Sequence, residues 1–275
     1  MLIDHHTHIV PYSSDARQTL SDLRTAVSQN GLDGVCITDH YEKDIYYIAG
    51  REDVFSLDEY FKHLQPYRQI QAGAQPLLLI GVELGYLPHL NRYYGQIAAE
   101  YPFDAVILSL HILDGEDPYV DEKIYRHGKA PLYTRYLERM CEMMVHCPDF
   151  DILGHYDYIT RYATYDDPKM RYRETPEAFD ALFRILIDTG KTLEINTRTI
   201  IKLQKAGYAG EDAWPDPEII TRYKQLGGRR ISLGSDAHQP GEPGGLFHET
   251  ADWLRDLGCR QLVYYIGRQA VMTSL

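Results

Sequence analysis

Seven short apolar stretches recur along the chain, and each is followed by a stretch in which apolar residues have helical spacing. This alternation is typical of βα units around a parallel sheet. Seven or eight such units with one core favour a closed α/β barrel over a doubly wound open sheet. The final apolar run, Leu262–Ile266, fits either an eighth strand or an element that closes the barrel. The predicted strands are 2–8, 34–39, 77–84, 104–110, 151–155, 192–196 and 230–236, and the predicted helices lie near 17–30, 56–72, 90–100, 132–147, 175–189, 216–227 and 246–257.

Each predicted strand ends in side chains that can bind a metal ion or an anion. In an α/β barrel the carboxyl ends of the strands meet at one face, where the βα loops build active sites. We therefore expect these side chains to lie close together. In strand order they are His6 and His8, Asp39 and His40, Glu83, Ser109 and His111, His155 and Asp157, Asn196 and Arg198, and Asp236 and His238.

The first strand carries the densest of these signals, in the run Asp4-His5-His6-Thr7-His8. Successive side chains of a strand alternate faces, so His6 and His8 point the same way, roughly 6–7 Å apart along the chain. Two converging imidazoles suit zinc, iron or manganese. The alternative is an exposed, frayed histidine run.

Taken singly, the other residues also have structural interpretations. His40 and His111 could be hydrogen-bonded core histidines, and Asp15 could cap the first helix. Together they favour metal ions, because burying so many titratable groups at one end of a barrel costs several kcal/mol for each uncompensated charge. Divalent cations are the simplest compensation.

Composition narrows the function classes. The net charge of −12 over 275 residues argues against a nucleic-acid backbone as the main partner. The four cysteines lack Cys-x-x-Cys spacing, so we interpret them as free thiols of a cytoplasmic protein. No apolar run approaches the ~18 residues of a membrane-spanning helix, and no signal peptide is visible. We expect no membrane partner.

Several strand-end motifs, in this order along nearly the whole chain, resemble the PHP (polymerase and histidinol phosphatase) superfamily. The motifs are His6-x-His8, Thr38-Asp39-His40, Gly81-Val82-Glu83, Ser109-x-His111, Gly154-His155 and Ser235-Asp236-x-His238. The resemblance implies one metallophosphoesterase domain over residues 1–275, folded as a distorted (β/α)7 barrel, with two to three divalent metal ions (Zn, Fe or Mn) at the C-terminal face of the strands.

The same resemblance implies a ligand set. One metal ion would be bound by His6, His8, Glu83 and Asp236. A second would share Glu83 as a bridging carboxylate and add His111 and His155. A third would be bound by Asp15, His40 and His238.

Within the superfamily the chain is most similar to stand-alone histidinol-phosphate phosphatases, on the evidence of Arg161 and Arg198. The resemblance implies that both arginines clamp phosphate, and a guanidinium fork suits that role because it binds two phosphate oxygens at once. The alternative for Arg161 is a salt bridge to Asp166 or Asp167. The implied reaction converts L-histidinol phosphate and water to L-histidinol and phosphate by attack of a metal-bridging hydroxide. Asp15 or His238 would help the leaving group.

Three other functions stay open. The substrate could be another phosphoester, such as a nucleotide, phosphotyrosine or another small phosphomonoester. Amidohydrolase chemistry also uses His-x-His in a barrel, but its bridging lysine has no equivalent here, since Lys43 and Lys191 are poorly placed. A non-catalytic metal-binding protein would need its open coordination positions blocked. Residues that recognise the rest of the substrate are expected in the loops 41–55 and 112–131.

Overall fold

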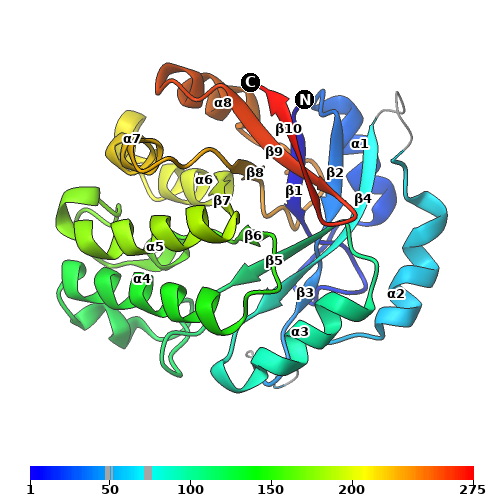
Figure 1. The fold of residues 1–275 in the computed structure, drawn as a ribbon, viewed down its shortest axis with the longest axis horizontal. Helices are drawn as coiled ribbons and strands as arrows, with labels where there is room; N and C mark the ends of the chain where they lie inside the picture. Colours follow the sequence, from blue (N-terminus) through cyan, green and yellow to red (C-terminus); the bar gives the residue numbers. More distant parts are fainter. Residues whose placement is uncertain (47–49, 51, 71–75) are drawn as a thin grey trace.

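The computed structural model describes residues 1–46, 50, 52–70 and 76–275. Parallel strands form one sheet in the order β2-β1-β8-β7-β6-β5-β4-β3, and an additional pairing between β2 and β4 closes it into a barrel. Figure 1 shows the helices around the outside of this sheet. The seven barrel strands are β1 (Ile3–Thr7), β2 (Gly34–Ile37), β4 (Leu77–Gly85), β5 (Ala105–Ser109), β6 (Ile152–Leu153), β7 (Thr192–Asn196) and β8 (Ile231–Gly234).

All seven predicted strands are present, and the closed α/β barrel is confirmed. Each strand is buried along its whole length, which explains why the strands appear in the sequence as short continuous apolar runs. The short strand β3 (His40–Tyr41) lies beyond β2 and pairs with β4, with His40 opposite Glu83. This pairing brings two predicted site residues together.

The predicted helices are also present, with shifted ends. The bounds are α1 (Leu20–Gln29), α2 (Leu57–Leu64), α3 (Asn91–Glu100), α4 (Lys129–His146), α5 (Pro176–Thr189), α7 (Pro217–Gln225) and α8 (Phe247–Asp256). The end of the helix predicted near 56–72 includes residues 71–72, which lie outside the described residues. Asp15 does not cap α1, because Thr19 occupies that position and forms a reciprocal capping box with Asp22. None of the described helices is long and apolar enough to span a membrane.

One helix was not predicted. α6 (Thr197–Lys205) begins immediately after β7, with Asn196 as its N-cap. Its first turns are rich in β-branched residues, which weakens the helical signal. The helix is important for the site because it carries Arg198.

The last apolar run closes the amino-terminal end of the barrel. β9 (Gln261–Ile266) pairs antiparallel with β10 (Gln269–Ser274), and this hairpin lies across the barrel strands in Figure 1. Val263 and Tyr265 pack on a cluster that includes Ile3 from inside the barrel. The two-residue turn, Gly267-Arg268, has positive φ at both positions, as tight hairpins require.

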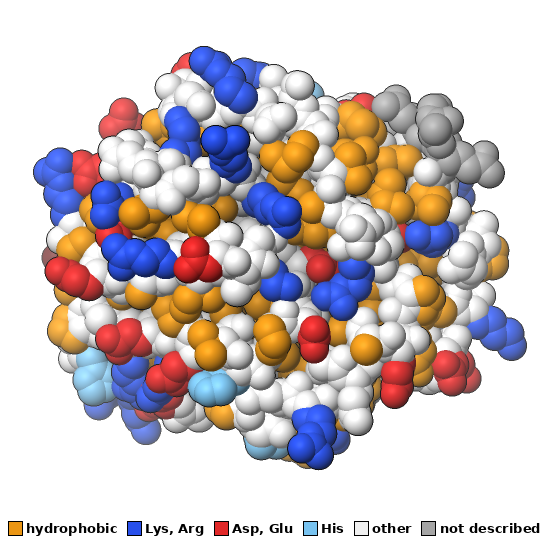
Figure 2. Space-filling model, in the orientation of Figure 1, with side chains coloured by type: hydrophobic (Ala, Val, Ile, Leu, Met, Phe, Trp, Pro, Cys, Tyr) orange, Lys and Arg blue, Asp and Glu red, His pale blue; other side chains and the backbone are white. Residues whose placement is uncertain are grey.

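Aspartates that precede two barrel strands anchor the hairpin. Asp104 accepts a hydrogen bond from the Gly267 backbone N–H at 2.9 Å, and Asp151 accepts one from Arg268 Nε at 2.9 Å. The predicted site is left at the opposite end of the barrel. On the described part of the face in Figure 2, Lys and Arg side chains are interspersed with acidic ones and do not gather in a stripe.

Candidate metal centre

A cavity of about 360 Å³ opens at the carboxyl ends of the barrel strands. Seven of the residues predicted for the site line it, and the remaining predicted ligands lie beneath them. The lining includes Asp15, His40, His111, Arg161, Arg198, Asp236 and His238. The strand ends therefore converge on one space.

The first predicted ligand group lies at the bottom of this cavity and is fully buried. His6 Nε2 is 3.2 Å from Glu83 Oε2, and His8 Nε2 is 3.3 Å from Asp236 Oδ1. The Nε2 atoms of both histidines and Glu83 Oε2 have no hydrogen-bond partner. Buried polar atoms without partners are costly, so three that point at one another indicate a position for a cation.

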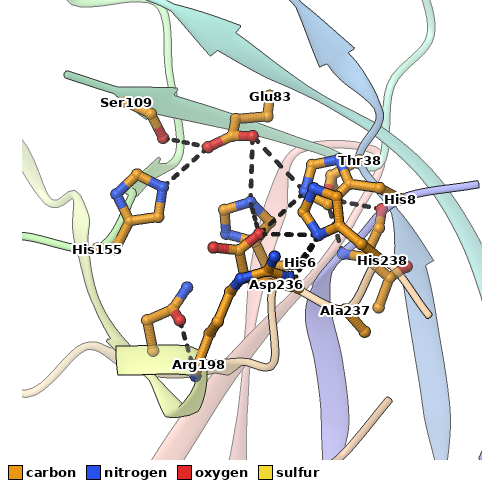
Figure 3. Close-up of polar contacts among 12 residues, drawn as sticks. His6, His8, Thr38, Glu83, Ser109, His155, Arg198, Asp236, Ala237 and His238 are labelled. Carbon is orange, nitrogen blue, oxygen red and sulfur yellow. Dashed lines mark hydrogen bonds and ion pairs between the residues drawn. The ribbon is translucent and has the colours of Figure 1, made fainter. Parts of the chain in front are cut away.

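The second group surrounds the other oxygen of Glu83. His155 Nε2 lies 3.1 Å and His111 Nε2 lies 3.3 Å from Glu83 Oε1, which also accepts a hydrogen bond from the Ser109 hydroxyl at 2.6 Å. In Figure 3 the Glu83 carboxylate lies between His155 on one side and His8 on the other. This position suits a bridging carboxylate.

The third group lies toward the cavity mouth. Asp15 Oδ2 is 3.0 Å from His238 Nε2, and Asp15 Oδ1 is 3.7 Å from His40 Nε2. The side chain of Asp15 is 58% exposed, whereas the two histidines are nearly buried. His8 stacks on His40 with ring centroids 4.0 Å apart, so the third group is contiguous with the first.

The structure brings all nine predicted ligands together, and the spacing of eight of them allows several ways to hold ions. In each of four sets the ligand atoms lie within 4.8 Å of one another. The sets are His8, His40 and His238; His6, His8 and Glu83; His6, His155 and Asp236; and His40, Glu83 and His111. The partition among three ions stays a prediction.

The electrostatics of the cluster also fit a cationic occupant. Burial would raise the pKa of Glu83, but His6 and His111 hold that pKa well below its ordinary value. Burial would likewise lower the pKa of His111, but Glu42 and Glu83 raise it to about 10. Protons on histidines thus balance the buried carboxylates, and bound divalent cations would displace those protons and take over the same role.

Three outer residues that the sequence did not single out orient the histidines. Glu194 Oε1 lies 2.8 Å from His6 Nδ1, Ser13 Oγ lies 3.2 Å from His8 Nδ1, and Glu42 pairs with His111 Nδ1. A hydrogen bond at Nδ1 leaves Nε2 free to bind a metal ion. Glu194 does carry a sequence signal, since it is a carboxylate inside the buried strand Thr192–Asn196.

Two glycines allow this close packing. A Cβ at Gly234 would collide with the Glu194 carboxylate, and a Cβ at Gly154 would collide with the Ser109 hydroxyl. Asp236, two residues after Gly234, has φ of 51°. Positive φ is uncommon outside glycine, and aspartate is one of the residues that adopt it most readily.

The two predicted phosphate clamps lie beside this cluster with different partners. Arg161 donates to Asp236 Oδ2 at 2.7 Å and to Asn196 Oδ1 at 2.8 Å, and its side chain is 2% exposed. It does not pair with Asp166 or Asp167. Arg198 lies 2.7 Å from His238 Nδ1 and donates to the backbone oxygen of Asp236. No described carboxylate pairs with Arg198, so it can receive an anion.

The family of the chain follows from comparison with known proteins. The model of the PHP domain family matches residues 4–198. The chain is 33% identical to "Probable histidinol-phosphatase" of Clostridium acetobutylicum, over 86% of this chain and 87% of that protein. It is 25% identical to "Histidinol-phosphatase" of Lactococcus lactis, over 96% of this chain and 94% of that protein. The chain belongs to the PHP domain family.

A solved structure shares the fold. The histidinol phosphate phosphatase of Lactococcus lactis, complexed with zinc, L-histidinol and phosphate, superposes with a TM-score of 0.85. The two chains are 24% identical, and the match covers 98% of each. This likeness agrees with the closed barrel found here.

Proposed function

We propose that this protein hydrolyses L-histidinol phosphate to L-histidinol and inorganic phosphate. One observation carries the proposal: the buried His and carboxylate cluster centred on Glu83 shares its cavity with Arg161 and Arg198. Such a site combines metal ligands with cations that suit a phosphate group. The names of the relatives from Clostridium acetobutylicum and Lactococcus lactis support this substrate over other phosphomonoesters.

The donor set fits two to three divalent metal ions. Imidazole and carboxylate ligands accept zinc, iron and manganese, and the zinc in the similar Lactococcus lactis structure supports zinc. His6, His8, Glu83 and Asp236 would bind one ion, His111 and His155 would complete a second with Glu83, and Asp15, His40 and His238 would bind a third. When bound, such ions lower the pKa of water and neutralise phosphate charge.

The remaining residues of the cavity have separable roles. Arg198 would bind phosphate oxygens, because it faces the cavity without a carboxylate partner. Arg161 would also contact phosphate, and its ion pair with Asp236 positions that ligand. Asp15 and His238 are the candidates to help the leaving oxygen, and they lie 3.0 Å apart toward the cavity mouth. Burial acts to raise the pKa of Asp15, but His238 and His40 have the larger effect and lower that pKa overall. An ionised Asp15 is better suited to bind a metal ion than to donate a proton.

The predicted domain and compartment fit this role. One continuous cluster of buried side chains extends from Ile9 to Leu262, which supports a single domain over 1–275. All four cysteines are free, which supports a cytoplasmic enzyme.

The decisive experiment measures phosphate release from L-histidinol phosphate and from a panel of other phosphomonoesters, with metal content determined on the same sample. We expect kcat/KM for L-histidinol phosphate to exceed every competitor by about a hundredfold, or about 2.7 kcal/mol. If metal ions are bound and a nucleotide or phosphotyrosine is preferred, the proposed phosphoesterase chemistry stands, and the assignment of L-histidinol phosphate as the substrate is wrong.

A further inference from the structure

We propose that Lys202 is a third cationic group that binds the substrate phosphate, in addition to Arg161 and Arg198. The proposal rests on the proposed function only in requiring a phosphate ester as substrate. Lys202 lies on α6, four residues after Arg198, and residues with this spacing share one face of a helix. Both side chains line the same cavity.

The ammonium group of Lys202 has an aromatic partner but no described carboxylate partner. Its Nζ lies over the ring of Tyr162, 5.4 Å from the ring centroid. Tyr162 itself lines the cavity, so the contact holds the ammonium at the cavity wall. An aromatic face stabilises a cation without neutralising it, and this leaves the charge of Lys202 available to an anion.

The surroundings of Lys202 make a bound anion favourable. The side chain is half-buried, and burial together with Arg198 and Arg161 lowers its pKa. Like charges four residues apart on a helix repel each other. Of the three Lys and Arg side chains that line the cavity, Arg161 already pairs with Asp236, whereas neither Arg198 nor Lys202 has a described carboxylate partner. A phosphate dianion would relieve the repulsion between Arg198 and Lys202.

Binding of inorganic phosphate to the metal-loaded enzyme tests the proposal without depending on the identity of the substrate. We expect Lys202→Gln to raise the Kd of phosphate by about ten- to a hundredfold, the range of one charged hydrogen bond. Lys202→Met, which keeps an unbranched apolar side chain without the charge, should show the same loss, and Lys202→Arg should restore binding. The matched control is Lys205→Gln, which removes an exposed lysine from the same helix.

Titration calorimetry at low and moderate ionic strength, with metal content measured for each variant, gives the readout. An unchanged Kd in Lys202→Gln, or a loss in Lys202→Gln that Lys202→Met does not share, would overturn the proposal. So would an equal loss in Lys205→Gln. If the wild-type enzyme prefers another phosphomonoester and Lys202→Gln still weakens phosphate binding, the substrate assignment fails and Lys202 keeps its role.

Discussion

Glu194 joins two predicted metal ligands, His6 on β1 and His155, which lies just after β6. One of its oxygens lies 2.8 Å from His6 Nδ1, and the other accepts the backbone N–H of His155 at 2.6 Å. Glu194 is fully buried, and its pKa is lowered by His6 although burial acts in the opposite direction. The carboxylate therefore fixes both the ring orientation of His6 and the position of His155.

Replacement of this carboxylate should weaken metal binding. Glu194→Gln keeps an acceptor near His6 but removes the charge that makes the imidazole a stronger ligand. We expect about ten- to a hundredfold lower metal affinity, the usual effect of losing such an outer partner. Competition with a chelator measures it. The exposed Glu249→Gln is the control, and equal affinities in the two variants would contradict this role.

Removal of the Arg198 guanidinium should affect catalysis and leave the metal ions in place. Arg198→Ala is expected to lower kcat/KM by about a hundredfold or more, because a charged phosphate contact in a sheltered site is lost. Metal content should match the wild type. Steady-state kinetics with elemental analysis on the same samples would decide, and unchanged kcat/KM would rule out the clamp.

Arg161→Met should behave differently from Arg198→Ala. Arg161 is paired with buried Asp236, and breaking a buried ion pair by removing one partner costs about 3–5 kcal/mol. We expect reduced metal content as well as a lower free energy of unfolding in metal-depleted protein. Urea denaturation and elemental analysis test both expectations. Wild-type stability with full metal content would show that Arg161 does not position Asp236.

Asp157 should make stability depend on pH. Burial raises its pKa from 3.8 to about 6, although Arg161 acts to lower it. The folded protein then binds more protons than the unfolded chain between these two values, so the free energy of unfolding contributed by Asp157 falls as pH rises through that window, by about 3 kcal/mol in total.

Asp157→Asn removes this titration and leaves an oxygen for the Thr199 hydroxyl, which donates to Asp157 at 3.0 Å. The stability of the variant relative to wild type should therefore increase from pH 4 to pH 7. Urea unfolding at several pH values, with metal concentration fixed, measures the difference. A constant difference across this range would refute the assignment.

The strand-end motifs were predictable because each belongs to a short buried strand whose direction is fixed by the βα alternation. His6 and His8 share a face for the same reason, and the structure places both beside Glu83. The closed barrel followed from the number of βα units. These features depend on local sequence patterns, which can be recognised in one sequence without knowledge of distant contacts.

Other parts depended on contacts distant in sequence. Glu42 carries no local mark of its pairing with His111, which lies 69 positions away. The ion pair of Arg161 with Asp236 joins residues 75 positions apart, whereas the sequence offered only nearby aspartates. The loops 41–55 and 112–131, expected to recognise the rest of the substrate, contribute Asp53, Tyr119 and Val120 to the cavity.

The hairpin β9–β10 also determines where the chain ends lie. The amino group of Met1 donates to the Thr273 hydroxyl at 2.9 Å, and Figure 1 shows the two termini side by side. Both leave the barrel at the end opposite the candidate metal centre. A fusion partner or affinity tag attached at either terminus would therefore lie away from the opening of the cavity. A short peptide linker between the termini would permit circular permutation of the barrel.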